Sequence, residues 1–179
     1  MITTLLGSCV SVCFYDPVNR IVGMNHYLTV SDYQIQNSQF ALTTGRVAEQ
    51  AMSQVISKML TKGAQYHLIK AKAFGGASVL KLSAEATITV GPGLQKIGKQ
   101  NTAFVKAYLI QAKIPLVAHD LEGTTGRVIY FNTTDFSVMV KKIRPPSQFN
   151  GLLNKTPVDI PKNLDWQKSN YTGAEAIIN

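Results

Sequence analysis

The chain has 179 residues, of which 45% are hydrophobic and 16% charged, and its mean hydropathy is close to zero. This composition predicts one soluble globular domain, and the length is short for two comparable domains. No apolar run approaches the roughly 18 residues of a membrane span, and no secretory signal opens the chain. We therefore expect a cytoplasmic protein without membrane insertion.

The formal net charge of +8 makes an acidic partner plausible, whether a protein, a nucleic acid or a membrane surface. The basic residues are scattered, and the densest groups are "KAK" at 70–72 and "VKKIR" at 140–144. No zinc-finger, RNA-recognition or phosphate-binding-loop signature accompanies them. A nucleic-acid partner is therefore not expected.

The first half of the chain predicts a hairpin followed by a helix. Residues 9–15 ("CVSVCFY") and 21–28 ("IVGMNHYL") are rich in strand-forming residues and flank the turn "DPVNR". Residues 39–62 change to helical spacing of apolar side chains, and Gly63 follows as the residue that ends the helix.

The second half predicts further strands around a second helix. Residues 67–77 read as a strand that ends in a Gly-Gly turn, and the segment 78–98 is ambiguous. Asn101 is the expected N-cap of a helix over 102–113. Three more strands are expected over 114–120, 126–132 and 136–143.

The character of the chain changes after Arg144. Residues 144–179 hold four of the seven prolines and show no clear periodicity. Nearly all of the net charge, +7 of +8, falls in residues 1–143. We expect one domain over 1–143 and a mostly irregular C-terminal extension over 144–179.

The hairpin brings a cysteine and a histidine together. In an antiparallel pair the second strand returns to the start of the first, so His26 lies near Cys9 although 17 residues separate them. A cysteine hydrolase needs a thiolate, a base and backbone N–H groups for the oxyanion. Gly7 would let a substrate approach the backbone, and the amides around Ser8 and Cys9 could hold its carbonyl oxygen.

Ordinary roles compete with this one. Strand cysteines are usually core residues, and Cys13, deeper in the strand, is expected to be packing. Four residues along a strand put the two thiols about 13 Å apart, too far for a disulfide. The three histidines do not complete a zinc site. Hydroxyls near the site could orient His26, namely those of Thr3, Thr4 and Ser8.

The motifs resemble those of the chemoreceptor glutamine deamidase CheD family. The matching stretches span about residues 1–143 and are "TTLLGSCVSVCFYDP", "GMNHYL", "AKAFGGA", "IGKQN", "IPLVAHDLEGTTGRVIYF" and "VMVKKI". One departure is "DLEG", in which Glu122 replaces the usual glycine.

The resemblance implies an α/β fold, a three-layer α/β/β sandwich like the catalytic domain of cytotoxic necrotising factor toxins. It implies hydrolysis of glutamine side chains of methyl-accepting chemotaxis receptors to glutamate through a cysteine thioester. The family's cysteine and histidine match Cys9 and His26, and its threonine, six residues before the cysteine, matches Thr3. It calls for no cofactor or metal, and it implies a CheC-type phosphatase as a second partner in organisms that have one.

Three functions thus compete: a receptor deamidase, an inactive CheD-like module that binds receptors or a CheC-type phosphatase, and a basic nucleic-acid-binding protein. A catalytic Cys9 would be marked by a lowered thiol pKa and by faster alkylation than Cys13. No aromatic-plus-basic motif supports the third function.

Overall fold

The computed structural model describes residues 1–28, 41–79 and 97–143, with side chains described from Ala48 onward in the first helix. Seven strands, two α-helices and a short 3₁₀ helix form in these ranges. They are β1 (Ile2–Leu6), β2 (Val10–Asp16), β3 (Ile21–Tyr27), α2 (Ala41–Thr61), η1 (Tyr66–Leu68), β4 (Lys70–Gly75), α3 (Ile97–Gln111), β5 (Leu116–Leu121), β6 (Arg127–Phe131) and β7 (Val138–Lys142).

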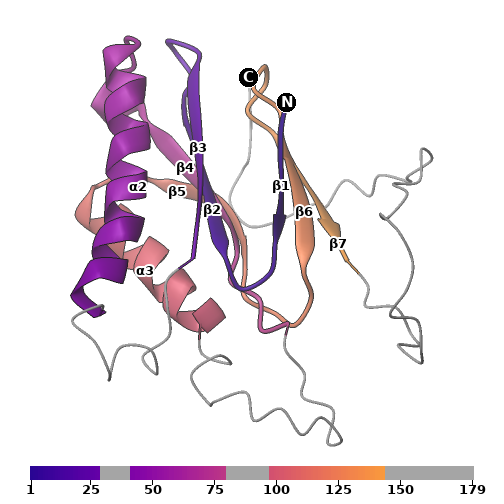
Figure 1. Ribbon diagram of the computed structural model, residues 1–179. Helices are drawn as coiled ribbons and strands as arrows, with labels where there is room; N and C mark the ends of the chain where they lie inside the picture. The colour runs from indigo at the N-terminus through magenta and orange to yellow at the C-terminus, as the bar shows by residue number, and fades with distance from the viewer. Residues whose placement is uncertain (29–40, 80–96, 144–179) are drawn as a thin grey trace, which may run out of the picture.

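The strands form two sheets (Figure 1). One has four strands in the order β3-β2-β4-β5, and the other has three in the order β1-β6-β7. The predicted hairpin is confirmed, because β2 and β3 pair antiparallel with Asp16 opposite Ile21 and Val10 opposite Tyr27. The β1 strand, which was not predicted, belongs to the other sheet, where it pairs with β6.

The four-stranded sheet buries both of its faces. Side chains of a strand alternate between faces, so Val10, Val12 and Phe14 pack on one side against α2 and α3. Cys13 and Tyr15 point to the opposite side, into a second apolar cluster that includes Leu6, Ile129 and Phe131 of the three-stranded sheet. In Figure 1 the helices accordingly lie on one side of the four-stranded sheet and β1, β6 and β7 on the other.

The first predicted helix is confirmed as α2. Its C-terminal end follows the expected pattern, because Gly63 has a φ of +102° and the amide of Ala64 donates to the carbonyl of Met59 at 3.0 Å. The expected apolar stripe is buried at Ala48, Met52 and Met59, whereas Leu60 is exposed.

The start of the second helix differs from the prediction. α3 begins at Ile97, so Asn101 lies in its second turn and is not an N-cap. The physical reason is tertiary: the buried Asn101 side chain donates to the carbonyl of Ser8, 93 residues earlier. Gly98 lets the first turn pack directly on the backbone of Gly76, where any Cβ would collide.

Two predictions lie outside the described residues, namely the irregular extension over 144–179 and most of the ambiguous segment 78–98. Among the helices that are described, none has the length and apolar character of a membrane span.

Candidate active site

Cys9 lies in a three-residue link, Gly7 to Cys9, that carries the chain from β1 to β2. Three consecutive carbonyl oxygens of this link accept hydrogen bonds at 2.8 Å: Gly7 from the amide of Ala77, Ser8 from Asn101 Nδ2, and Cys9 from the amide of Gly76. The link is therefore held by the end of β4 and by α3.

The Gly-Gly turn after β4 makes this attachment possible. Gly75 has a φ of +115°, and a Cβ there would collide with the carbonyl oxygen of Cys9. Only glycine combines this left-handed backbone with so close an approach. The "FGGA" stretch thus holds the backbone of Cys9 in place, although more than 60 residues separate them in the sequence.

His26 and Cys9 lie on the same face of the four-stranded sheet. His26 stands directly opposite Ser11 in the β2–β3 pair. Cys9 is two residues before Ser11 and packs with the cluster that also holds Cys13, so it shares that face. Cys9 directly precedes the Val10–Tyr27 pair, which places it diagonal to His26, and diagonal neighbours in a β-ladder have Cα atoms about 7–8 Å apart. The strand register thus agrees with the proximity that the hairpin predicted.

The hydroxyl that reaches His26 belongs to Thr4. Its Oγ1 lies 3.0 Å from His26 Nδ1, and the contact joins β1 of one sheet to β3 of the other. The family resemblance had pointed to Thr3 for the orienting role, and the structure places Thr3 elsewhere. Thr4 faces inward with Ile2 and Leu6, whereas Thr3 and Leu5 alternate to the exposed side.

Partial desolvation favours the neutral forms of Cys9 and His26, although the His26 side chain is exposed overall. This desolvation raises the pKa of the Cys9 thiol, which the residue's own backbone amide lowers to a lesser extent. It also lowers the pKa of His26. The direction of the Cys9 shift is opposite to the lowered thiol pKa that is expected of an activated nucleophile. Because Thr4 engages Nδ1, Nε2 is the ring nitrogen that a role in proton transfer would use.

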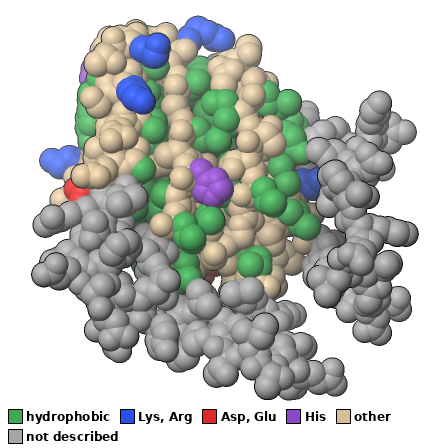
Figure 2. All heavy atoms as spheres, in the orientation of Figure 1, with side chains coloured by type: hydrophobic (Ala, Val, Ile, Leu, Met, Phe, Trp, Pro, Cys, Tyr) green, Lys and Arg blue, Asp and Glu red, His purple; other side chains and the backbone are tan. Residues whose placement is uncertain are grey.

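The remaining candidates are ordinary. Burial raises the pKa of Cys13 to about 12, in keeping with its predicted packing role. His67 in η1 and His119 in β5 are exposed. In the ranges that the structure describes, no three His, Cys, Asp or Glu side chains gather as metal ligands. Figure 2 shows Lys and Arg side chains toward the edges of a face whose middle is uncharged.

Sequence reasoning missed two contacts of this site. Thr4 was one of three open candidates, and the alternation of Ile2, Thr4 and Leu6 would have selected it had β1 been recognised as a strand. Asn101 was assigned to a helix cap, and nothing in its local sequence indicates a bond to Ser8.

The family is settled by comparison with known proteins. The model of the CheD family, described as CheD chemotactic sensory transduction, matches residues 31–142. The chain belongs to the CheD family. The match begins after His26, so the roles of Cys9 and His26 depend on the geometry above and on the resemblance of their motifs.

Three relatives from the CheD family illustrate the degree of similarity. The probable chemoreceptor glutamine deamidase CheD 1 of Geobacter sulfurreducens is 44% identical over 80% of the chain and 70% of the relative. CheD 2 of Shewanella oneidensis is 41% identical over 77% and 66%, and CheD 2 of Chromobacterium violaceum is 34% identical over 80% and 66%. The chain spans about two thirds of the length of these curated relatives.

Proposed function

We propose that the protein is a cysteine-dependent protein-glutamine deamidase that acts on methyl-accepting chemotaxis receptors. One observation supports this most directly: the Thr4 hydroxyl fixes His26 on the sheet face that also carries Cys9. The names of the CheD relatives, chemoreceptor glutamine deamidases, supply the substrate class.

The chemistry balances with these residues alone. His26 takes the proton of the Cys9 thiol as sulfur attacks the carboxamide carbon of a receptor glutamine. His26 then returns that proton to the amide nitrogen, which leaves as ammonia from a thioester. Water, deprotonated by His26, attacks the thioester carbon, and the proton passes to the departing sulfur. The products are glutamate and ammonia, and the thiol is regenerated.

Gly7 and Ser8 are proposed to position the substrate and its oxyanion. Because the carbonyl oxygens of the link are bound on the protein side, the amides that follow them point away from those partners. Backbone N–H groups so directed can stabilise the negative charge that develops on the carboxamide oxygen. Thr4 replaces Thr3 as the proposed orienter of His26.

The proposal extends to the fold and the partners. The helices, the four-stranded sheet and the three-stranded sheet are proposed to form the three-layer α/β/β sandwich that resembles the cytotoxic necrotising factor catalytic domain. A CheC-type phosphatase is the proposed second partner. The free thiols of Cys9 and Cys13 support a cytoplasmic location.

The test is deamidation of a purified receptor cytoplasmic fragment, followed as ammonia release and a one-dalton mass gain per glutamine. We expect Cys9→Ala to lower the rate on the order of 10⁴-fold, because the nucleophile is lost. Cys13→Ala is the matched control and should retain most of the activity, since that thiol is buried away from substrate.

An equal mass gain from the Cys9→Ala variant would remove Cys9 from the nucleophile role. Binding of the receptor fragment by the wild-type chain without any mass gain would favour the inactive CheD-like module.

A further inference from the structure

Asn101 is joined to the neighbours of both proposed catalytic residues. Its side-chain Nδ2 donates to the carbonyl of Ser8, the residue before Cys9, at 2.8 Å. Its backbone carbonyl accepts a hydrogen bond from the hydroxyl of Tyr27, the residue after His26, at 3.0 Å. Asn101 itself is fully buried. One residue of α3 therefore fixes the two strands of the hairpin where they carry Cys9 and His26.

The bond to Ser8 also sets the direction of the next amide. The described peptide bonds are all trans, and in a trans peptide the C=O and the following N–H point in opposite directions. Asn101 comes from α3, which packs on one face of the four-stranded sheet, whereas Cys9 packs on the other. Drawing the Ser8 carbonyl toward α3 turns the Cys9 N–H toward the thiol side. The lowering effect of this N–H on the Cys9 pKa agrees with that direction.

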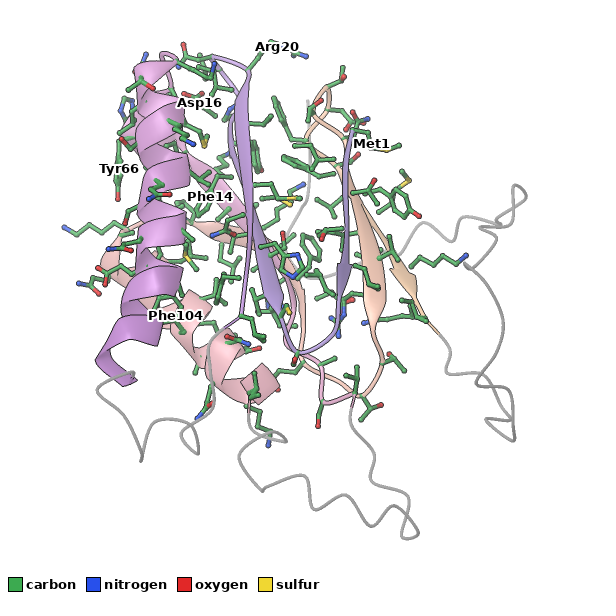
Figure 3. All side chains as sticks on the ribbon, viewed as in Figure 1. Met1, Phe14, Asp16, Arg20, Tyr66 and Phe104 are labelled. Atoms are coloured by element: carbon green, nitrogen blue, oxygen red, sulfur yellow. The ribbon has the colours of Figure 1, made fainter. Side chains whose placement is uncertain are left out.

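The surroundings of Asn101 keep it in place. Tyr27 packs edge-on against Phe104, one turn further along α3, with ring centroids 5.7 Å apart. Figure 3 shows Phe104 in the region where α2 and α3 approach each other. The close contact of Gly98 with Gly76 holds the first turn of α3 against the same loop that binds the Cys9 carbonyl. The "IGKQN" and "FGGA" motifs thus meet at the link that carries Cys9.

We propose that Asn101 is a positioning residue that fixes the Ser8–Cys9 peptide, so that the Cys9 amide N–H faces both the thiol and the carbonyl oxygen of the substrate. The role in catalysis rests on the proposed deamidase function. The orientation of the amide does not, and it can be tested in the full chain without a substrate.

The experiment measures Cys9 alkylation by iodoacetamide as a function of pH, with peptide mass spectrometry to separate Cys9 from Cys13. Asn101→Leu keeps the number and branching of the side-chain heavy atoms and removes the donor, and Asn101→Ala is the second variant. Val105→Ala is the matched control, because Val105 is equally buried on the same helix and packs in the apolar cluster on the helix side of the sheet, whereas Cys9 packs against the other cluster. We expect the Asn101 variants to raise the pH midpoint of Cys9 alkylation by about 0.5–1 pH unit, since the thiolate loses an oriented donor. Val105→Ala should leave the midpoint unchanged.

Deamidation kinetics form the second readout. We expect Asn101→Leu to lower kcat about 10–100-fold with KM within about twofold, because the oxyanion contact forms in the transition state. An unshifted alkylation midpoint in both Asn101 variants, or an equal shift in Val105→Ala, would overturn the inference. If the wild-type chain shows no deamidation, the proposed function fails, while the alkylation midpoint still decides the role of Asn101.

Discussion

The two ends of the β2–β3 hairpin differ in how their ionisable side chains are hydrogen-bonded and in which protonation state is favoured. At the turn end, Asp16 is fully buried and accepts four hydrogen bonds, from the amides of Val18, Asn19 and Gln65 and from the Asn19 side chain. Burial alone would raise its pKa, yet these donors together lower it. Figure 3 shows Asp16 beside the C-terminal end of α2.

At the other end, partial desolvation favours the neutral forms of Cys9 and His26, and among the described residues a hydroxyl, that of Thr4, lies within hydrogen-bond distance of the histidine ring. The turn end of the hairpin is thus organised for stability, and the end with Cys9 and His26 is the one proposed for chemistry. A charge that is met by four donors is a fixed part of the fold. Two neutral groups that can exchange a proton retain the capacity to react.

The largest expected effect tests the turn end. Asp16→Ala should lower the free energy of unfolding by about 2–4 kcal/mol, because it removes a buried carboxylate that accepts four hydrogen bonds. Asp135→Ala, which removes the acceptor of Ser137 in an exposed turn, should cost less than about 1 kcal/mol. Urea denaturation measures both.

The pH dependence of Asp16 has a defined sign. Because its folded pKa is lowered, its contribution to stability is present above the unfolded value of about 3.9 and is lost as the pH falls through the folded pKa. If Asp16→Ala leaves the free energy of unfolding unchanged, the hydrogen bonds at the turn end do not stabilise the fold.

The next prediction concerns the histidine contact. Thr4→Val keeps the shape of the side chain and removes the hydroxyl, so we expect deamidation to fall about 10–100-fold through misorientation of His26. Thr3→Val is the matched control on the exposed face and should stay within about twofold of the wild type. A larger loss from Thr3→Val than from Thr4→Val would reverse the assignment.

A smaller effect is expected in the pH–rate profile. In the proposed mechanism His26 must be neutral to accept the thiol proton, and desolvation lowers its pKa. The acid limb of kcat/KM should therefore lie below the ordinary histidine value of about 6.5, and activity should be lost as the pH falls through the folded pKa. Alkylation of Cys9 that is flat from about pH 5 to 8 would instead indicate a stable thiolate–imidazolium pair.

The smallest expected effect is a gain in the free energy of unfolding, near the Cys9 end of the hairpin, with no change in the deamidation rate. Glu122 has a φ of +67° and donates its amide to the carbonyl of Gly75. Glu122→Gly should raise the free energy of unfolding by about 0.5–1 kcal/mol, since glycine adopts this conformation without strain. Glu122→Ala retains the strain and should give no gain. Urea midpoints and deamidation rates decide whether stability changes alone.

Local periodicity predicted much of this fold. The hairpin of Cys9 and His26 and the buried face of α2 depend on neighbours a few residues apart, which sequence patterns encode directly. The contacts of Thr4 and Asn101 depend on how one sheet docks on another and how α3 docks on the Gly7–Cys9 link. Those contacts join residues 22 and 93 positions apart, and no local pattern specifies them. The extra strand β1 escaped prediction for the same reason, because its partner β6 lies more than 120 residues away.

The contact of Thr4 with His26 has a further consequence. In the proposed mechanism the general base stands on one sheet and the hydroxyl that orients it stands on the other, so turnover would require the two sheets to stay docked. Small separations of the sheets would disconnect the base before either sheet lost its own hydrogen bonds. Deamidation should then be lost at a lower temperature or denaturant concentration than secondary structure. The activity would therefore report whether the two sheets are docked.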